Sequence, residues 1–257
     1  MVTAGVDVGA ATVKAVILKD GQIVGRSVFK VELEREEACE EAFDKALTDA
    51  AIDRSDVEHI IATGTGRDEV SFANDTITDI IAGARGAAWL FPGIRTVIDV
   101  GAEEARGIKA DRSGKVISYA KNEKCAAGVG AFADAMARAL EIGLDEMGPL
   151  SLKSTEDIAM NAACVVFAES EVVSLIHARK SKENIAKAVH EAIATRITSM
   201  LRRVGIEKEV AIIGGMAKNI GVIECLNKHL GVELRVPEDP RIMCAVGAAL
   251  IAETGGE

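Results

Sequence analysis

The stretch that decides the fold is VIDVGA at residues 97–102, because it repeats the stretch GVDVGA at residues 5–10. Each stretch is typical of a buried strand that ends in an aspartate, with a glycine two residues further on. A second strand follows each copy and runs into a hairpin turn, at Asp20-Gly21 after the first copy and at Ser113-Gly114 after the second. Two matching copies indicate an internal duplication of one strand-and-hairpin motif.

The rest of the chain alternates between helical and strand patterns, which is typical of α/β proteins. Apolar residues at helical spacing cover residues 36–51, 76–90, 130–142, 168–178, 183–204, 219–230 and 243–253. Further strand patterns cover residues 59–64, 209–213 and 232–236. Pro92-Gly93 ends the second helix just before the second copy. We therefore predict two α/β domains, residues 1–93 with a returning C-terminal helix at 242–257, and residues 94–241.

The composition excludes several classes of function. The chain of 257 residues is long enough for two domains, and 49% of its residues are apolar. Its net charge of −10 disfavours nucleic acid and anionic membranes, which attract basic surfaces. No apolar run approaches the roughly 18 residues of a membrane span, and the start lacks the pattern of a secretory signal. These features predict a cytoplasmic protein with no nucleic-acid or membrane partner.

The duplicated turns carry residue types suited to a nucleotide. A glycine after a strand lets backbone N–H groups approach phosphate oxygens, and a nearby aspartate can hold a hydrated Mg²⁺. Two such turns facing one another across a cleft would clamp a triphosphate from both sides. Gly214-Gly215 follows another apolar strand pattern and suits a nucleoside. The chain has no P-loop pattern, and GVGAFA at 128–133 does not follow a strand, as a dinucleotide fingerprint requires.

Cys125 and Cys164 stand apart because each precedes a predicted helix whose start is rich in small residues. A helix N-terminus stabilises negative charge, so thiolates or a thiolate-ligated cluster would fit there. The alternative is that both are small buried apolar residues, and spacing alone leaves both interpretations open. A [4Fe-4S] cluster needs four thiolates, which a two-fold dimer would supply from two such cysteines per chain.

Three stretches resemble the nucleotide motifs of the superfamily of acetate and sugar kinases, Hsp70 and actin. Residues 7–12 resemble its first phosphate motif, residues 99–104 its second, and residues 212–217 its adenosine motif. The resemblance implies an α/β fold of two ribonuclease H-like (actin-like ATPase) domains with an ATP cleft between them. Asp7 and Asp99 would then handle Mg²⁺ and the attacking water. The residues expected against ATP or ADP are Gly9, Ala10, Ala11, Thr12, Lys14, Gly101, Ala102, Gly214, Gly215 and Met216.

The cysteine segments NEKCAAG at 122–128 and CVVFAESEV at 164–172 resemble the ATPase family of 2-hydroxyacyl-CoA dehydratase activators and benzoyl-CoA reductase ATPase subunits. ATGTGR at 62–67 resembles the same family. The resemblance implies that residues matching Cys125 and Cys164 from two subunits, either two copies or two homologous subunits, ligate one [4Fe-4S] cluster. It also implies that ATP hydrolysis drives a low-potential electron from ferredoxin or flavodoxin to the catalytic subunits of an acyl-CoA reductase or dehydratase.

The second phosphate motif departs from the activators, which usually carry DIGGQD where this chain has DVGAEE at residues 99–104. That form is more similar to the small ATPase subunits of benzoyl-CoA reductases, and it leaves Glu103 as the candidate for positioning the attacking water. The sequence therefore favours an ATP-hydrolysing electron-transfer subunit of a benzoyl-CoA reductase. The alternatives are a stand-alone homodimeric dehydratase activator, a small-molecule kinase of the same fold, and a nucleotide-dependent assembly protein.

Overall fold

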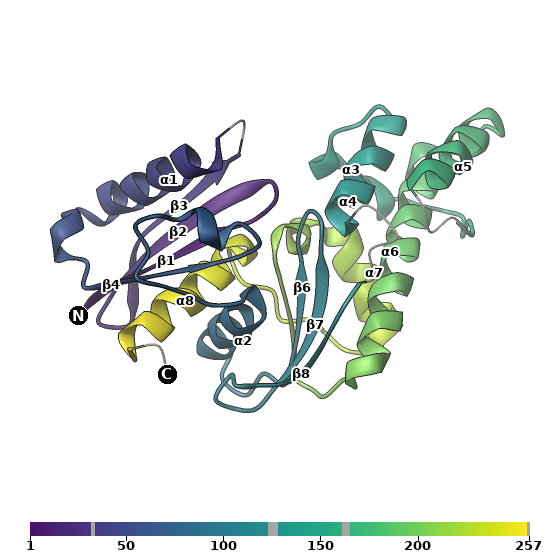
Figure 1. Ribbon diagram of the computed structural model, residues 1–257. Coiled ribbons are helices and arrows are strands. Elements are labelled where there is room, and N and C mark those ends of the chain that lie inside the picture. The colour runs from purple at the N-terminus through teal and green to yellow at the C-terminus, as the bar shows by residue number, and fades with distance from the viewer. Residues whose placement is uncertain (32–33, 123–127, 161–164, 256–257) are drawn as a thin grey trace.

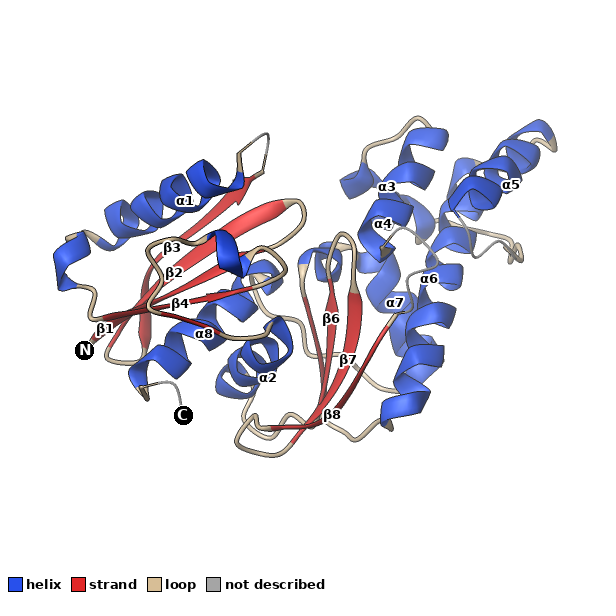
Figure 2. Cartoon of the chain, in the orientation of Figure 1, coloured by secondary structure: helices blue, strands red, loops and turns tan. Residues whose placement is uncertain are grey.

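The computed structural model describes residues 1–31, 34–122, 128–160 and 165–255, and two β-sheets run through these residues (Figure 1, Figure 2). The strands are β1 (Val2–Val8), β2 (Thr12–Lys19), β3 (Gln22–Lys30), β4 (His59–Thr63), β5 (Asp75–Thr76), β6 (Thr96–Val100), β7 (Ala105–Ala110), β8 (Val116–Lys121) and β9 (Val210–Ile213). The first sheet has the order β3-β2-β1-β4-β5 and the second the order β8-β7-β6-β9.

Helices cover both sheets and fill the space between them. The helices are α1 (Arg35–Ala50), α2 (Asp79–Leu90), α3 (Val129–Ala139), α4 (Leu144–Ser151), α5 (Val165–His177), α6 (Lys182–Val204), α7 (Ile220–Leu230) and α8 (Met243–Glu253). Short 3-10 turns lie at Arg54–Asp56, Arg67–Glu69, Gly215–Lys218 and Pro240–Ile242. We call β1–β5 with α1 and α8 the first lobe, and β6–β9 with α3–α7 the second lobe. Among the described residues, no helix is both long and apolar enough to cross a membrane.

The duplication is visible in the strand register of both lobes. β1 pairs antiparallel with β2 and parallel with β4, and β6 pairs in the same way with β7 and β9. Asp7 near the end of β1 and Asp99 near the end of β6 therefore occupy corresponding positions. Because parallel strands bring their carboxyl ends to one edge of a sheet, each aspartate lies at the edge where ligands of α/β proteins usually bind.

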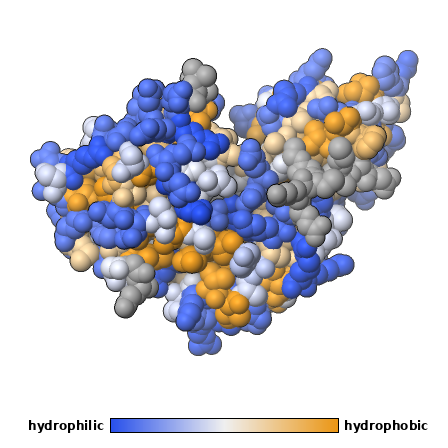
Figure 3. Space-filling view, viewed as in Figure 1, coloured by the Kyte–Doolittle hydropathy of each residue, from blue (hydrophilic) through white to orange (hydrophobic). Residues whose placement is uncertain are grey.

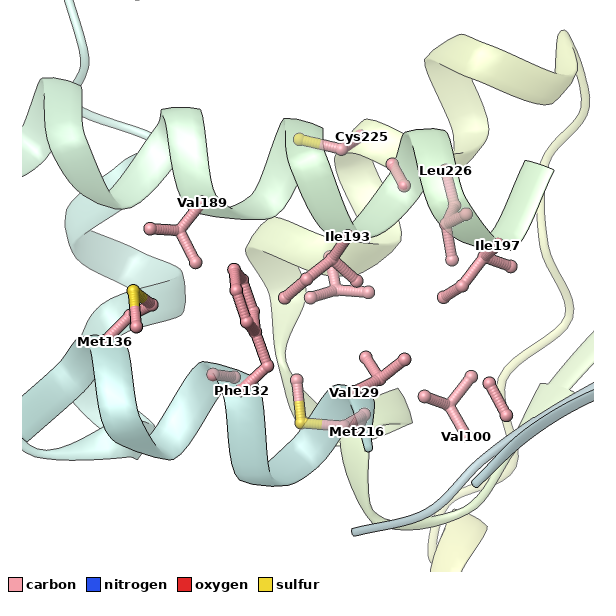
Figure 4. Close-up of a cluster of buried hydrophobic side chains, with 14 of the residues drawn as sticks. Val100, Val129, Phe132, Met136, Val189, Ile193, Ile197, Met216, Cys225 and Leu226 are labelled. Atoms are coloured by element: carbon pink, nitrogen blue, oxygen red, sulfur yellow. The ribbon is translucent and has the colours of Figure 1, made fainter. Parts of the chain in front are cut away.

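The core of the second lobe forms between its sheet and the amphipathic helices α3, α6 and α7 (Figure 4). Phe132 and Met136 of α3 point toward Val189 and Ile193 of α6, and all four side chains are fully buried. The two residues on each helix are spaced by about one helical turn, so one face of each helix is apolar. This packing fixes the start of α3 beside the sheet edge that carries Asp99.

Helices α2 and α8 join the two lobes through a shared core that also includes residues of both sheets. The two helices touch backbone to backbone, because a Cβ added to Gly247 would lie only 1.8 Å from the carbonyl oxygen of Ala82. A Cβ added to Gly86 would lie 2.1 Å from the carbonyl oxygen of Met243. Glycine at these positions therefore permits the close crossing that holds the lobes side by side.

Some predicted elements differ from the structure. The predicted strand at 232–236 is wrong: that stretch forms a single parallel bridge, between Arg235 and Ala211. Pro237 follows directly and has no N–H with which to extend a ladder. The sequence pattern does not predict helix α4, because this helix is short and contains Pro149, a residue that usually ends helical patterns.

A buried histidine ties three helices of the second lobe together. His190 of α6 is fully buried, with Nδ1 2.9 Å from Ser151 Oγ and Nε2 3.2 Å from Asn219 Nδ2. Ser151 Oγ donates onward to the carbonyl oxygen of Gly148 at 2.7 Å. The amide of Asn219 donates to Nε2, so Nδ1 carries the proton and donates to Ser151. Burial lowers the pKa of His190 to about 4 from its usual 6.5.

This shift predicts acid sensitivity of the fold. In the unfolded chain the side chain of His190 is protonated below about pH 6.5, whereas in the folded protein it stays neutral down to about pH 4. The folded state therefore loses stability relative to the unfolded state as the pH falls through this window. At pH 5 the loss from His190 alone is about 2 kcal/mol relative to pH 7.5. Urea unfolding at pH 7.5 and pH 5 measures this loss of stability, with His190→Asn as the matched variant. An equal loss in the parental protein and in His190→Asn would show that His190 does not cause the acid sensitivity.

Candidate functional site

A cavity of about 470 Å³ opens where the two duplicated turns face one another. The space-filling view shows a notch between the two lobes (Figure 3). The cavity is lined by residues that the sequence assigns to nucleotide, Mg²⁺ or water. They are Asp7, Gly9, Ala10, Ala11, Thr12, Lys14, Asp99, Gly101, Ala102, Glu103, Gly214, Gly215 and Met216. The fold thus brings three distant parts of the chain to one place.

Both turns are closed by the same backbone hydrogen bond. The N–H of Gly9 donates to the carbonyl oxygen of Thr12 at 3.0 Å, and the N–H of Gly101 donates to that of Glu104 at 2.8 Å. This closure bends the chain sharply after each aspartate. The backbone of the residues between, such as Ala10 in the first turn, therefore lines the cavity instead of continuing the sheet.

Each aspartate forms an ion pair with the cation opposite it in its hairpin. Lys14 Nζ lies 3.0 Å from Asp7 Oδ2, and Arg106 Nη1 lies 2.8 Å from Asp99 Oδ2. The side chain of Lys14 is only 12% exposed, so it is held at the cavity and is not a freely solvated surface lysine. The same pairing in both lobes places two carboxylates and two cations around the cavity.

Asp79 is a third carboxylate of this cavity, and sequence reasoning did not identify it. It lies in the first turn of α2, where Thr78 caps the helix by accepting a hydrogen bond from the N–H of Ile81. Its carboxylate contacts Arg106, which also binds Glu104 Oε2 at 2.7 Å. In the sequence Asp79 has the pattern of an ordinary acidic residue at a helix start, and only the fold carries it to the cavity.

The buried carboxylates repel one another. Burial raises the pKa of Asp99, although the nearby charge of Arg106 opposes this shift. Burial also raises the pKa of Asp79, again against Arg106, while the charge of Asp7 adds to the rise. A raised carboxyl pKa means that the negative charge is costly in this environment. A hydrated divalent cation beside these carboxylates would offset that cost, and Mg²⁺ keeps most of its waters and needs only one or two protein carboxylates.

Gly214, which the sequence assigns to the nucleoside, has a position that requires a glycine. Its φ is +88°, a backbone conformation that favours glycine. A Cβ there would lie 2.5 Å from the carbonyl oxygen of Val100 and 2.7 Å from Asp99 Oδ1. The turn after β9 therefore packs directly against the aspartate turn, with Met216 and Arg241 beside it on the cavity wall.

Cys125 and Cys164 lie outside the described residues. Gly128, three positions after Cys125, caps α3, and α5 begins at Val165, immediately after Cys164. Helices α3 and α5 pack against each other. Within the described ranges, no group of three or more His, Cys, Asp or Glu side chains could hold a metal ion.

The other cysteines are core residues. Cys39, Cys225 and Cys244 are all buried, with at most 7% exposed. Burial raises the pKa of Cys39 to about 11 and that of Cys225 to about 12. Their thiols are therefore protonated near neutral pH and poorly suited to bind a metal.

Comparison with known sequences gives matches along nearly the whole chain. The sequence profile of the BadF/BadG/BcrA/BcrD ATPase family matches residues 4–252. The chain is 41% identical to the activator of lactoyl-CoA dehydratase from Anaerotignum propionicum, over 98% of this chain and 97% of that protein. It is 32% identical to a benzoyl-CoA reductase subunit from Thauera aromatica, over 97% of this chain and 92% of that protein.

Solved structures give the same result for the fold. Component A of (R)-2-hydroxyglutaryl-CoA dehydratase from Acidaminococcus fermentans superposes with a TM-score of 0.96 at 34% identity, covering 100% of this chain and 99% of that one. The activator of 2-hydroxyisocaproyl-CoA dehydratase from Clostridium difficile, solved with bound ADPNP, has a TM-score of 0.93 at 32% identity, covering 100% of this chain and 96% of that one. A ROK family glucokinase from Streptomyces griseus has a TM-score of 0.63 at 16% identity, covering 99% of this chain and 100% of that one, and it shows similarity of fold alone. The expected α/β fold of actin-like ATPases is confirmed.

Proposed function

The chain belongs to the BadF/BadG/BcrA/BcrD ATPase family, and from this premise we propose that it is the ATPase that activates a 2-hydroxyacyl-CoA dehydratase. In this role it hydrolyses ATP and passes a low-potential electron to the dehydratase. Two copies would share one [4Fe-4S] cluster through Cys125 and Cys164, and ferredoxin or flavodoxin would supply the electron. The higher sequence identity to an activator than to the benzoyl-CoA reductase subunit supports this choice.

The observation that carries the ATPase assignment is the cavity lined by both duplicated turns and by Gly214-Gly215. Asp7 and Asp99 would orient a hydrated Mg²⁺, which when bound neutralises charge on the phosphates. Lys14 and Arg106 hold these two carboxylates in place. Glu103 is exposed on the cavity wall and stays our candidate for accepting a hydrogen bond from the attacking water. The products are ADP and inorganic phosphate.

The cavity is linked by hydrogen bonds to the first turn of α3, the helix that follows the segment carrying Cys125 in the sequence. The N–H of Gly130 donates to the carbonyl oxygen of Gly101 at 3.2 Å, and the N–H of Ala131 donates to that of Ala102 at 2.9 Å. The first turn of α3 is therefore attached to the second phosphate turn. A shift of that turn on ATP binding would move α3 and, with it, the chain that leads back to Cys125. This attachment supports coupling between nucleotide and cluster.

The surface of α5 supports a second copy at the cluster. Val166 and Phe167 are 65% and 69% exposed, and Val173 and Ile176 also expose much of their side chains. Large apolar side chains exposed along one helix often mark an interface. Val166 and Phe167 follow Cys164 closely in the sequence, so a second copy packed here by a two-fold axis would bring its own cysteines close. The starts of α3 and α5 also suit an anionic cluster, since helix N-termini favour negative charge.

A subunit of a benzoyl-CoA reductase is the second candidate, because the turn DVGAEE resembles that branch of the family. In the structure Glu104 binds Arg106 and Lys121 at 2.7 and 3.3 Å. This ion pairing gives the acidic residue at 104 a function in shaping the turn. A glutamate at 103 is compatible with an activator as well, because its exposed carboxylate can contact water.

Anaerobic purification followed by two activity assays tests the proposal. We expect a brown protein with the absorbance band of an iron-sulfur cluster. With ATP and a reductant, it should switch on a 2-hydroxyacyl-CoA dehydratase and leave the catalytic subunits of a benzoyl-CoA reductase inactive. The opposite preference would favour the second candidate. A colourless protein that phosphorylates a small molecule would overturn both.

A further inference from the structure

The duplication extends beyond the two hairpins to the parallel strand that follows each of them. Asp7 of β1 is in register with Thr63, the last residue of β4, and Asp99 of β6 is in register with Ile213, the last residue of β9. A glycine with positive φ follows in both cases, Gly64 at +91° and Gly214 at +88°. The turn after β4 is therefore the counterpart in the first lobe of the turn assigned to the nucleoside.

The two turns also pack alike. A Cβ on Gly64 would lie 2.4 Å from the carbonyl oxygen of Val8 and 2.6 Å from Asp7 Oδ1, which matches the contacts of Gly214 with Val100 and Asp99. Gly64 and Thr65 line the same cavity as the phosphate turns. The cavity thus has two corresponding walls, one from each lobe, on either side of the paired aspartates.

The two walls differ in polarity. Where the second lobe has Ile213 and Gly215, the first has Thr63 and Thr65. Thr65 is exposed, and within the described part of the chain the buried Thr63 Oγ1 has no hydrogen-bond partner. Hydroxyl donors suit an anionic group, whereas a small apolar turn suits the flat face of a nucleoside.

Thr65 is carried by a braced turn. The N–H of Gly66 donates to the carbonyl oxygen of Val8 at 3.0 Å, which ties the turn to the end of β1. Arg67 Nη1 donates to the carbonyl oxygen of Gly64 at 3.1 Å, which closes the turn from the other side. The backbone of such a turn is held in position before a ligand arrives, so only the side chain of Thr65 must be ordered when a ligand binds.

We infer that Thr65 donates a hydrogen bond to the terminal phosphate of ATP and is the residue by which the first lobe distinguishes ATP from ADP. The inference rests on the proposed function, in which the nucleoside lies against Gly214-Gly215 and the phosphates run between the two aspartate turns. The terminal phosphate of ATP then faces the wall at Gly64-Thr65. ADP has no third phosphate and therefore does not reach this wall. The TGTGR segment, whose role the sequence left open, thereby gains a function.

The test compares nucleotide affinities of Thr65→Val with those of the parental protein. Valine keeps the branched shape and removes the hydroxyl, so affinity for a non-hydrolysable ATP analogue should fall about tenfold or more, the usual effect of losing a hydrogen bond to a charged group. Affinity for ADP should be unchanged. Thr65→Ser should restore analogue binding. Thr76→Val, at an exposed position of β5, is the matched control and should bind both nucleotides normally.

The outcomes separate this inference from the proposed function. If the parental protein binds neither nucleotide, the ATPase assignment itself fails. If the parental protein binds both and Thr65→Val retains the parental ratio of analogue to ADP affinity, the role of Thr65 is refuted while the ATPase assignment stands. An equal loss of affinity for both nucleotides would also refute it, because that result indicates damage to the turn.

Discussion

Asp99→Asn is expected to lower the rate of ATP hydrolysis by about a hundredfold or more. The substitution keeps the shape of the side chain and removes one of the buried charges that would orient Mg²⁺, and losing one such electrostatic contribution typically has an effect of this size. Phosphate release at saturating MgATP measures it. Asp53→Asn, at an exposed position outside the cavity, is the control and should retain the parental rate.

The buried environment of Asp99 makes this test specific. The Asp99→Asn variant would leave Arg106 paired with Asp79 and Glu104, so Arg106 keeps two of the three ion pairs that it forms in the parental protein. Folding should therefore survive, which ADP binding can verify. Hydrolysis at the parental rate in a variant that binds ADP would show that the cleft has been assigned wrongly.

Cys125→Ser and Cys164→Ser are each expected to remove nearly all the iron and to weaken the dimer at the same time. A cluster that has four cysteine ligands loses one from each subunit in either variant. Because a cluster that binds only the assembled dimer also stabilises it, loss of iron should shift the equilibrium toward monomer. Iron content and mass by anaerobic light scattering are the two readouts.

Cys39→Ala is the matched control, because Cys39 is buried between α1 and its sheet. This variant should keep both its iron and its dimer. Full iron in Cys125→Ser, or an iron-loaded monomer of the parental protein, would contradict the proposed ligands. An iron-free but stable dimer would leave the ligands in place and refute only the claim that the cluster holds the subunits together.

Much of the fold could be predicted because its signals are local. The repeated strand-Asp-x-Gly stretch specifies the centre of both sheets, and the structure pairs Asp7 with Lys14 as it pairs Asp99 with Arg106. The strand predicted at 232–236 failed because its apolar residues serve packing, while Pro237 limits its pairing to one bridge. Hydrophobic pattern alone does not distinguish these two uses of an apolar run.

The site was predictable where glycine and aspartate act through the backbone next to them, and not where partners come from distant elements. Asp79 reaches the cavity only because α2 crosses between the lobes and directs its first turn at Arg106. The likeness of Gly64 to Gly214 likewise requires knowledge of strand register and of φ, neither of which a single sequence contains. The apolar surface of α5 is another such feature, since exposure depends on what the rest of the chain covers.

Dependence of electron transfer on ATP is the central claim, and rapid mixing tests it most directly. The reduced protein is mixed anaerobically with a purified 2-hydroxyacyl-CoA dehydratase, and the absorbance of the iron-sulfur cluster is followed with MgATP or with MgADP. Our account predicts oxidation of the cluster with MgATP, little with MgADP, and a loss of the difference in Asp99→Asn. Equal oxidation with both nucleotides, or none with MgATP, would contradict it.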